Sequence, residues 1–238
     1  MLILAIETST PRSSVALVGQ DGVVADAALG VPRRHGEFLV PAIVFLLAQS
    51  GRTVQDVTGV AVGLGPGLYT GLRVGIATAI TFASARGLPA VGLSGLDVLA
   101  FQARHVRRVI CSTIDARRGE LFWGLYRQAP GGVQRESELR VGSPDTLAAE
   151  LQGLGEPCLV LGDAARRHAK ELAVHHDIEL DPTSAGHPLA ADLGTLALPR
   201  FVREETERAL ELRPIYLRTA DAKIGWEQRG RLRGGADS

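Results

Sequence analysis

The sequence predicts an α/β fold in two halves, each with a mixed sheet flanked by helices. Short runs rich in branched residues alternate with longer apolar segments of helical spacing, which is typical of a layered α/β protein. The order of these segments restarts near Val109, so the second half repeats the plan of the first. The chain has 238 residues, 45% of them apolar, which is enough to bury a sizeable core.

In the first half we expect three strands, then a helix, a strand, a helix and a strand. Turn residues at 10–13 and 20–22 separate the first three strands, and the second turn predicts a hairpin. Gly87 is expected to end the second helix. The strands are expected at 2–7, 14–18, 23–28, 59–64 and 90–93, and the helices at 38–49 and 70–86.

The second half is expected to repeat this plan. Ser143 and Pro144 provide an N-cap and a first-turn proline for one helix. Strands are expected at 109–114, 121–127, 133–141 and 159–162, and helices at 143–152, 164–174 and 190–204. We therefore expect subdomains at 1–104 and 105–218, with the helix near 190–204 packing back on the first. The polar segment 219–238 is expected to be a disordered tail.

Composition limits the classes of partner. Basic and acidic residues both number 26, so no overall field draws the protein to nucleic acid or to a membrane. Cys111 and Cys158 lie in apolar runs and form no C-x-x-C pair, which favours reduced thiols. The apolar start is too short for a signal sequence, and the run at 74–85 is shorter than the ~20 residues of a membrane span. We expect a soluble, cytoplasmic protein without a membrane partner.

The glycine-rich stretch at 63–73, GLGPGLYTGLR, does not match the common phosphate-binding loops. A P-loop needs a lysine followed by a hydroxyl residue, and the stretch has no lysine. A dinucleotide-binding loop needs a third glycine, and Thr70 stands at that position.

A ridge of small residues follows instead. Gly71, Gly75, Ala79 and Ala83 recur every four residues, so one side of the predicted helix allows close packing. The ridge packs either against this chain's own sheet and the helix at 38–49 or against another molecule. We favour another molecule, because the helix at 38–49 is apolar nearly all round. The expected partner interface comprises Phe38, Leu39, Ala42, Leu46, Leu68, Tyr69, Thr70, Gly71, Leu72, Arg73, Gly75, Ile76 and Ala79.

Four segments resemble the TsaB (YeaZ) family: ILAIETST with SVALV, AVGLGPGLYTGLRVGIATA, IDARRGELFWGLY and ELRPIYLR. The resemblance covers about residues 1–218. It implies a duplicated RNase H-like, actin-like (ASKHA) fold. It also implies a non-catalytic scaffold that dimerises with TsaD and supports transfer of threonylcarbamoyl to the adenosine beside the anticodon of tRNAs. The ATPase TsaE is a further implied partner, and a homodimer is expected when the chain is alone.

The residues support a role without chemistry of its own. TsaD-type proteins carry an H-x-x-x-H metal pair, and the aligned positions here are Gly95 and Leu99, which cannot bind a metal. None of the six histidines forms such a pair, so we expect neither a metal site nor catalytic residues. Arg117 and Arg118 replace a glycine-rich phosphate loop. We expect them at a solvated hairpin tip, with phosphate binding as the alternative.

Glu7, Thr8 and Ser9 keep the form of a first phosphate loop. A turn hydrogen-bonded to itself is favoured there, and weak contact with a nucleotide or magnesium stays open. No cofactor of its own is expected, and ATP or ADP with magnesium stays open for the partner complex. Contact with tRNA is expected to be indirect, because the local basic runs lack interleaved aromatic residues. The alternatives to a scaffold are an independent actin-like ATPase or kinase and a homodimeric binding protein without a role in modification.

Overall fold

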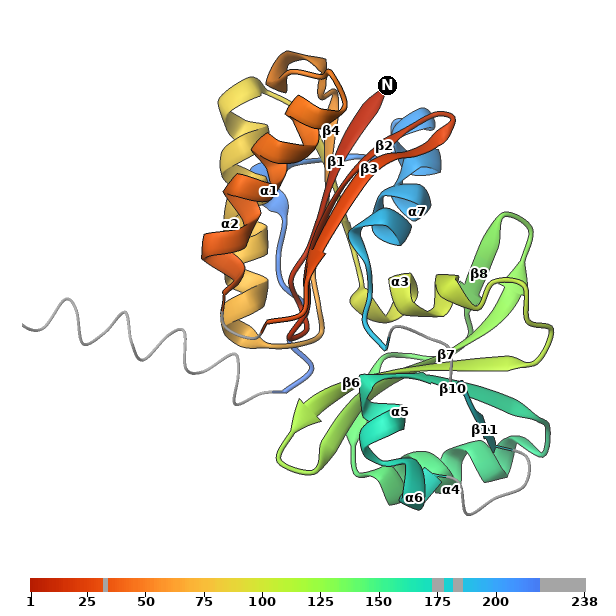
Figure 1. Ribbon diagram of the computed structural model, residues 1–238. Helices are drawn as coiled ribbons and strands as arrows, with labels where there is room; N and C mark the ends of the chain where they lie inside the picture. The colour runs from red at the N-terminus through yellow and green to blue at the C-terminus, as the bar shows by residue number, and fades with distance from the viewer. Residues whose placement is uncertain (32–33, 173–177, 182–185, 219–238) are drawn as a thin grey trace, which may run out of the picture.

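Two lobes make up the protein, each built on a six-stranded mixed sheet (Figure 1). The computed structural model describes residues 1–31, 34–172, 178–181 and 186–218. The predicted tail at 219–238 lies outside these residues. Within the described residues, no helix combines the length and the apolar character needed to cross a membrane.

The first sheet has the strand order β12-β5-β4-β1-β2-β3. The two hairpin connections join β1, β2 and β3 in antiparallel fashion, whereas β4 and β5 lie parallel to β1 on its other side. The strands are β1 (Leu2–Glu7), β2 (Ser13–Gly19), β3 (Gly22–Leu29), β4 (Gly59–Gly63), β5 (Pro89–Leu93) and the late edge strand β12 (Glu207–Arg208).

The second sheet repeats the arrangement with the order β11-β10-β6-β7-β8, and β9 also pairs with β7. Here β6, β7 and β8 are antiparallel, and β10 and β11 lie parallel to β6. This repeat confirms the duplicated α/β fold class. The strands are β6 (Val109–Arg117), β7 (Glu120–Ala129), β8 (Gly132–Arg135), β9 (Arg140–Gly142), β10 (Cys158–Gly162) and β11 (Ile178–Leu180).

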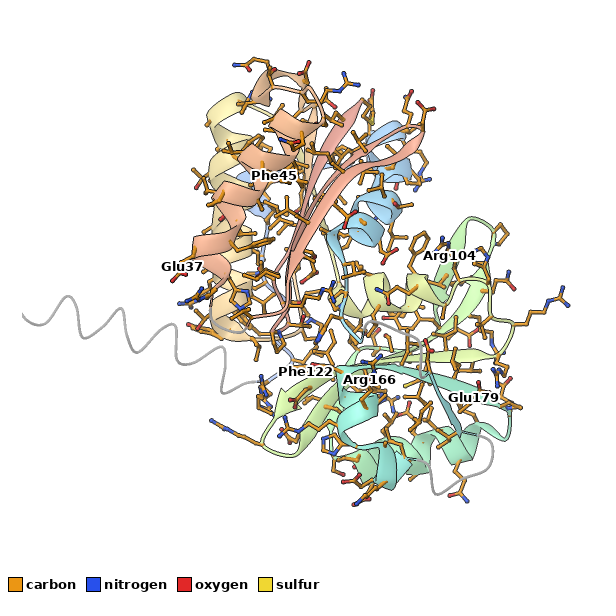
Figure 2. The ribbon with its side chains drawn as sticks, in the orientation of Figure 1. Glu37, Phe45, Arg104, Phe122, Arg166 and Glu179 are labelled. Atoms are coloured by element: carbon orange, nitrogen blue, oxygen red, sulfur yellow. The ribbon has the colours of Figure 1, made fainter. Side chains whose placement is uncertain are left out.

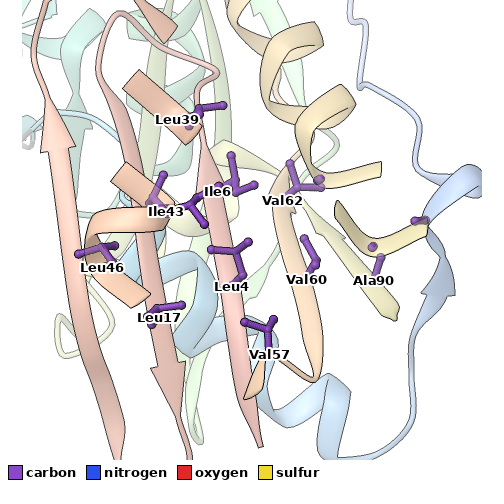
Figure 3. Close-up of a cluster of buried hydrophobic side chains, with 14 of the residues drawn as sticks. Leu4, Ile6, Leu17, Leu39, Ile43, Leu46, Val57, Val60, Val62 and Ala90 are labelled. Atoms are coloured by element: carbon purple, nitrogen blue, oxygen red, sulfur yellow. The ribbon is translucent and has the colours of Figure 1, made fainter. Parts of the chain in front are cut away.

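Helices cover both faces of the first sheet. The helices α1 (His35–Gln49) and α2 (Tyr69–Arg86) lie side by side on one face, and α7 (Ala190–Val202) lies on the other (Figure 1). Alternation along β1 explains these two layers: Leu4 and Ile6 pack towards α1 and α2, whereas Ile3 and Ala5 pack towards α7. Figure 3 shows the larger of these clusters. Two short 3-10 helices, Val54–Asp56 and Ala209–Glu211, complete the lobe.

The second sheet lies between α3 on one face and three helices on the other. The helix α3 (Gly95–Gln102) packs on β6, β7 and α7, at the junction of the lobes (Figure 1). The other face is covered by α4 (Pro144–Leu154), α5 (Asp163–Arg167) and α6 (Ala169–Leu172). Ser143 caps α4 as predicted, since its side chain accepts a hydrogen bond from the Thr146 amide.

Several predicted boundaries differ from the structure. The expected strand at 133–141 is two strands, β8 and β9, and the helix expected at 164–174 is divided into α5 and α6. The helix α3 was not predicted. The helix α1 begins at His35, three residues earlier than expected, and Pro41 lies in its interior. Residues 59–63 form β4, one residue shorter than expected.

Candidate functional site

The glycine-rich turn after β4 contacts the chain's own backbone. The Leu68 amide donates to the Ser9 carbonyl at 2.7 Å, and the Gly95 amide donates to the Gly65 carbonyl at 2.8 Å. A Cβ atom on Gly67 would lie 2.1 Å from the Ser9 carbonyl oxygen. The turn therefore joins the end of β1 to the start of α3, and its glycines permit this close approach.

Glu7 lies at the end of β1 and has no exposed surface. Its Oε1 accepts a hydrogen bond from the Ser9 amide at 2.6 Å, while Oε2 has no partner among the described residues. A Cβ on Gly63 would lie 1.9 Å from Oε2, so only glycine at that position leaves room for the carboxyl group. Burial raises the pKa of Glu7 to about 7, although the hydrogen bonds from Ser9 oppose this shift.

This enclosure agrees with the favoured expectation of a turn that is hydrogen-bonded to itself. Glu7 and Ser9 are fully buried, Thr8 is 2% exposed, and the Thr8 hydroxyl donates to the Gly71 carbonyl at 2.7 Å. None of the three side chains is available to a nucleotide or to a hydrated magnesium ion. The residues at the end of β1 therefore do not fit ATP with magnesium, the ligand pair that an actin-like ATPase fold implies.

The ridge of small residues on α2 also contacts the chain itself. A Cβ on Gly71 would lie 2.2 Å from the Thr8 carbonyl oxygen, and one on Gly75 would lie 2.2 Å from the Thr8 hydroxyl oxygen. Ala79 and Ala83 have no exposed surface. The expectation that this ridge meets another molecule is therefore wrong, because β1 and its turn occupy it.

Other residues of the expected interface are likewise internal. They lie in the core cluster between α1, α2 and the first sheet, part of which appears in Figure 3, and they are Leu39, Ala42, Leu46 and Ile76. Leu72 is 1% exposed and is the side chain nearest the Cβ position of Gly65. These five side chains stabilise the lobe and are not available to a partner.

Five residues of the expected interface do reach the surface. Thr70 and Arg73 are exposed, and Phe38, Leu68 and Tyr69 are half-buried. The Arg73 guanidinium lies 3.8 Å from the centre of the Tyr69 ring, and the Tyr216 ring lies 6.0 Å from Tyr69. These residues stay predicted partner contacts.

The outer side of α1 carries an apolar surface that the prediction missed. Val40, Val44 and Phe45 are 59%, 61% and 58% exposed, and Pro41 between them is exposed as well. We call these four residues the α1 outer face. An apolar groove of about 420 Å³ adjoins it between α1 and β3, where Phe38 and Phe45 are among the lining residues. Figure 2 shows Phe45 and Glu37 on this helix.

The hairpin between β6 and β7 is held by carboxylates. Asp115 Oδ2 lies 3.2 Å from Arg117 Nη1 and 2.8 Å from Arg167 Nη1. The Asp115 amide donates to Asp163 Oδ1 at 2.9 Å, and burial raises the pKa of Asp163 to about 6. The Arg117 side chain is 48% exposed and Arg118 is exposed, so the tip of this hairpin is solvated as predicted.

The histidines that the structure describes are dispersed. His35 is buried, and its Nδ1 lies 2.6 Å from the Ser13 hydroxyl. His187 Nδ1 lies 3.9 Å from Asp163 Oδ2, and burial together with nearby arginines lowers its pKa to about 4. Within residues 1–31, 34–172, 178–181 and 186–218, no three His, Cys, Asp or Glu side chains are grouped as a metal site.

Comparison with known proteins decides the family. TsaB of Escherichia coli K12 is 30% identical over 232 residues, covering 96% of this chain and 98% of that protein. The chain belongs to the TsaB (YeaZ) family. TsaB of Bacillus subtilis 168 is 33% identical over 236 residues, covering 95% of this chain and 98% of that protein. The solved YeaZ structure from Pseudomonas aeruginosa has a TM-score of 0.80 and 28% identity, covering 91% of this chain and 99% of that one.

A sequence profile of the related TsaD family, described as tRNA N6-adenosine threonylcarbamoyltransferase, matches residues 3–226. The E. coli and B. subtilis TsaB relatives are named for tRNA threonylcarbamoyladenosine biosynthesis. The resemblance to the TsaB (YeaZ) family drawn from the motifs is thereby confirmed.

Proposed function

We propose that this chain is a non-catalytic subunit for tRNA threonylcarbamoyladenosine synthesis that docks a TsaD-type catalytic protein through the α1 outer face. The observation that carries the proposal is the exposure of Val40, Val44 and Phe45 on one side of one helix. Large apolar side chains that gather on a surface mark interaction sites, whereas scattered ones do not. The family relatives are named for tRNA threonylcarbamoyladenosine biosynthesis, and for this reason we propose a TsaD-type protein as the partner.

The surface residues of α2 extend this docking surface. The helix α2 lies beside α1 on the same face of the sheet (Figure 1), so Tyr69, Thr70 and Arg73 belong to the same side of the lobe. In the absence of the partner, the same surface is proposed to pair with a second copy around a two-fold axis. TsaE is proposed to join the complex of this chain with TsaD.

An independent ATPase or kinase activity has less support. It would require Glu7 and the Gly65–Gly67 turn to hold a nucleotide, but Glu7 has no exposed surface and the turn packs against Leu72 and the Ser9 backbone. ATP or ADP with magnesium, where the complex uses them, is proposed to be bound with the partner's residues. The chain's own contribution is then to hold the partner in an active arrangement.

The test changes an exposed apolar side chain and compares it with a matched one elsewhere. Val44 and Val202 are 61% and 60% exposed, but Val202 lies at the end of α7, on the other face of the sheet. Val44→Glu is expected to abolish co-elution with the TsaD-type protein in size-exclusion chromatography and to reduce self-association. Val202→Glu is expected to co-elute as the unaltered chain does. Equal behaviour of the two variants would contradict the proposed surface.

A further inference from the structure

Six arginines from four distant segments gather where the two lobes join. Two lie at the β6–β7 hairpin tip and two on α5, while Arg12 lies in the β1–β2 turn and Arg218 near the C-terminal end of the described chain. We call them the interlobe arginine cluster: Arg12, Arg117, Arg118, Arg166, Arg167 and Arg218. We propose that this cluster binds the phosphate groups of RNA directly.

Shared contacts connect the members of the cluster. Arg117 and Arg167 both pair with Asp115, and Arg218 donates to the Arg117 carbonyl at 3.3 Å. Burial is the main cause of the low pKa of His187, and the positive charges of Arg12 and Arg166 nearby lower it further. Figure 2 shows Arg166 on the second lobe near the junction. Asp163 links the two groups, since it accepts from the Asp115 amide and lies 3.9 Å from His187, while Arg117, Arg118, Arg166 and Arg167 are the exposed members.

The cluster carries an excess of positive charge. The carboxylate of Asp115 lies 3.2 and 2.8 Å from two guanidinium groups, and the nearby carboxylate of Asp163, which accepts a hydrogen bond from the Asp115 amide, is a second acidic group of this surface. Glu120 is paired with Arg218. Arg118 is exposed and, among the described residues, forms no ion pair. A chain whose charges sum to zero has thus concentrated a positive surface at one place.

The backbone of the hairpin tip is a second and independent observation. Arg117 has a φ of 66° and Arg118 a φ of 57°, followed by Gly119 at 77°. Side chains with a Cβ destabilise this left-handed conformation, and turns of this kind usually carry asparagine and glycine. Two arginines where smaller residues would be more stable indicate that their side chains serve something other than folding.

The chemistry of the cluster fits a chain of phosphates better than one free nucleotide. Guanidinium groups form paired hydrogen bonds with phosphate oxygens. The side chains of Arg117 and Arg167 are 48% and 56% exposed, so they form an open surface and not a closed pocket. The turn at Glu7, which would have to face a bound triphosphate, is enclosed. An RNA backbone presents phosphates along such a surface.

The choice of tRNA rests on the proposed function, and it replaces the expectation that contact with tRNA is indirect. The cluster is separate from the α1 outer face: Phe45 lies on the first lobe, whereas Arg166 lies on the second (Figure 2). Both surfaces are therefore free to act in one complex. Because phosphate contacts carry no base information, binding is expected to be similar for tRNAs of different sequence.

The experiment measures binding of the full chain to a fluorescent tRNA transcript as salt is raised from about 50 mM. The double variant Arg118→Ala with Arg167→Ala removes two exposed charges from the cluster. Arg52→Ala with Arg200→Ala removes two exposed charges elsewhere and is the control. Losing two phosphate contacts is expected to lower the slope of log Kd against log salt by about 1.5, with no change in the control. Equal slopes, or no saturable binding by the unaltered chain, would overturn the inference.

Further arms distinguish RNA binding from a purely structural role, a nucleotide site and a protein contact. Arg118→Gly removes the charge and places glycine at a position with a positive φ of 57°. The variant is therefore expected to be more thermally stable and to bind tRNA more weakly. Unchanged tRNA binding would contradict a ligand role for Arg118. ATP is expected not to displace tRNA at concentrations equal to that of the RNA, and displacement would indicate a nucleotide site instead. The double variant is expected to keep its association with the TsaD-type protein. If the double variant lost its association with the TsaD-type protein but still bound tRNA, the cluster would be a protein-binding surface. Val44→Glu tests the proposed function separately.

Discussion

Replacing Gly71 by alanine tests whether the small-residue ridge of α2 is internal. The added Cβ would lie 2.2 Å from the Thr8 carbonyl oxygen, about 1 Å closer than a tolerable contact, so the helix or the β1 turn must move. Overpacking of this kind costs about 1–3 kcal/mol. Disturbing the hydrogen bond from the Thr8 hydroxyl to the Gly71 carbonyl adds about 1 kcal/mol.

Helix propensity works in the opposite direction, because alanine is favoured over glycine by about 1 kcal/mol inside a helix. The net expectation is a loss of about 1–3 kcal/mol in the free energy of unfolding. Gly153 in α4 provides the matched control, since no atom lies within 4 Å of its Cβ position. Gly153→Ala should therefore gain up to about 1 kcal/mol.

Urea unfolding followed by tryptophan fluorescence measures both variants, with Trp123 buried at 1% exposure as the reporter. If the ridge were a free surface, Gly71→Ala would gain stability in the same way as Gly153→Ala. Gains of similar size in the two variants would refute the internal packing described for α2.

Two further predictions concern Glu7 and Ser143. Burial raises the pKa of Glu7 from 4.5 to about 7, so between these pH values the folded state holds a proton that the unfolded state has lost. This proton binding contributes at most about 3 kcal/mol to the free energy of unfolding. The contribution is fully present below about pH 4.5 and is lost as the pH rises through 7. Glu7→Gln should accordingly flatten the decline of stability between about pH 5 and 8, and an unchanged curve of melting temperature against pH would show that Glu7 is ionised when folded. Ser143→Ala removes the N-cap of α4, whose hydroxyl accepts from the Thr146 amide at 3.2 Å, and should cost about 1 kcal/mol in urea unfolding. Ser143→Asp, which also caps, is expected to retain the stability of the unaltered chain.

The layer plan was predictable because the apolar runs and turn residues determine it locally. Hairpin turns, Gly87 at the end of α2 and the Ser143 cap all act within a few residues of the sequence. The helix α3 was missed because its start depends on distant partners: the Gly95 amide donates to Gly65 across the turn that follows β4. Its apolar side chains are buried by β6, which follows it in the sequence, and by β7, β8 and α7, which lie further along the chain.

The site was harder to predict, for a physical reason. The apolar residues of α1 surround the helix, so the sequence does not show which side meets the sheet; the structure buries Leu39 and Leu46 and exposes Val44 and Phe45. Small residues on α2 fit equally well against the chain's own strand or against a partner, and only the position of Thr8 decides between them. The sequence shows Arg117 and Arg118 as adjacent arginines, but it does not show that Arg12, Arg166, Arg167 and Arg218 lie near them, because these residues come from three other segments.

Reconstituted tRNA threonylcarbamoylation is the decisive assay for the proposal that this chain acts by docking a catalytic partner. The assay would combine a TsaD-type protein, TsaE and tRNA, and titrate the unaltered chain, Val44→Glu or Val202→Glu. No modification is expected from the chain alone. Val44→Glu is expected to raise the concentration needed for half-maximal modification by more than about tenfold, while Val202→Glu leaves it unchanged. Modification by the chain without TsaD, or equal titration curves for the two variants, would contradict it.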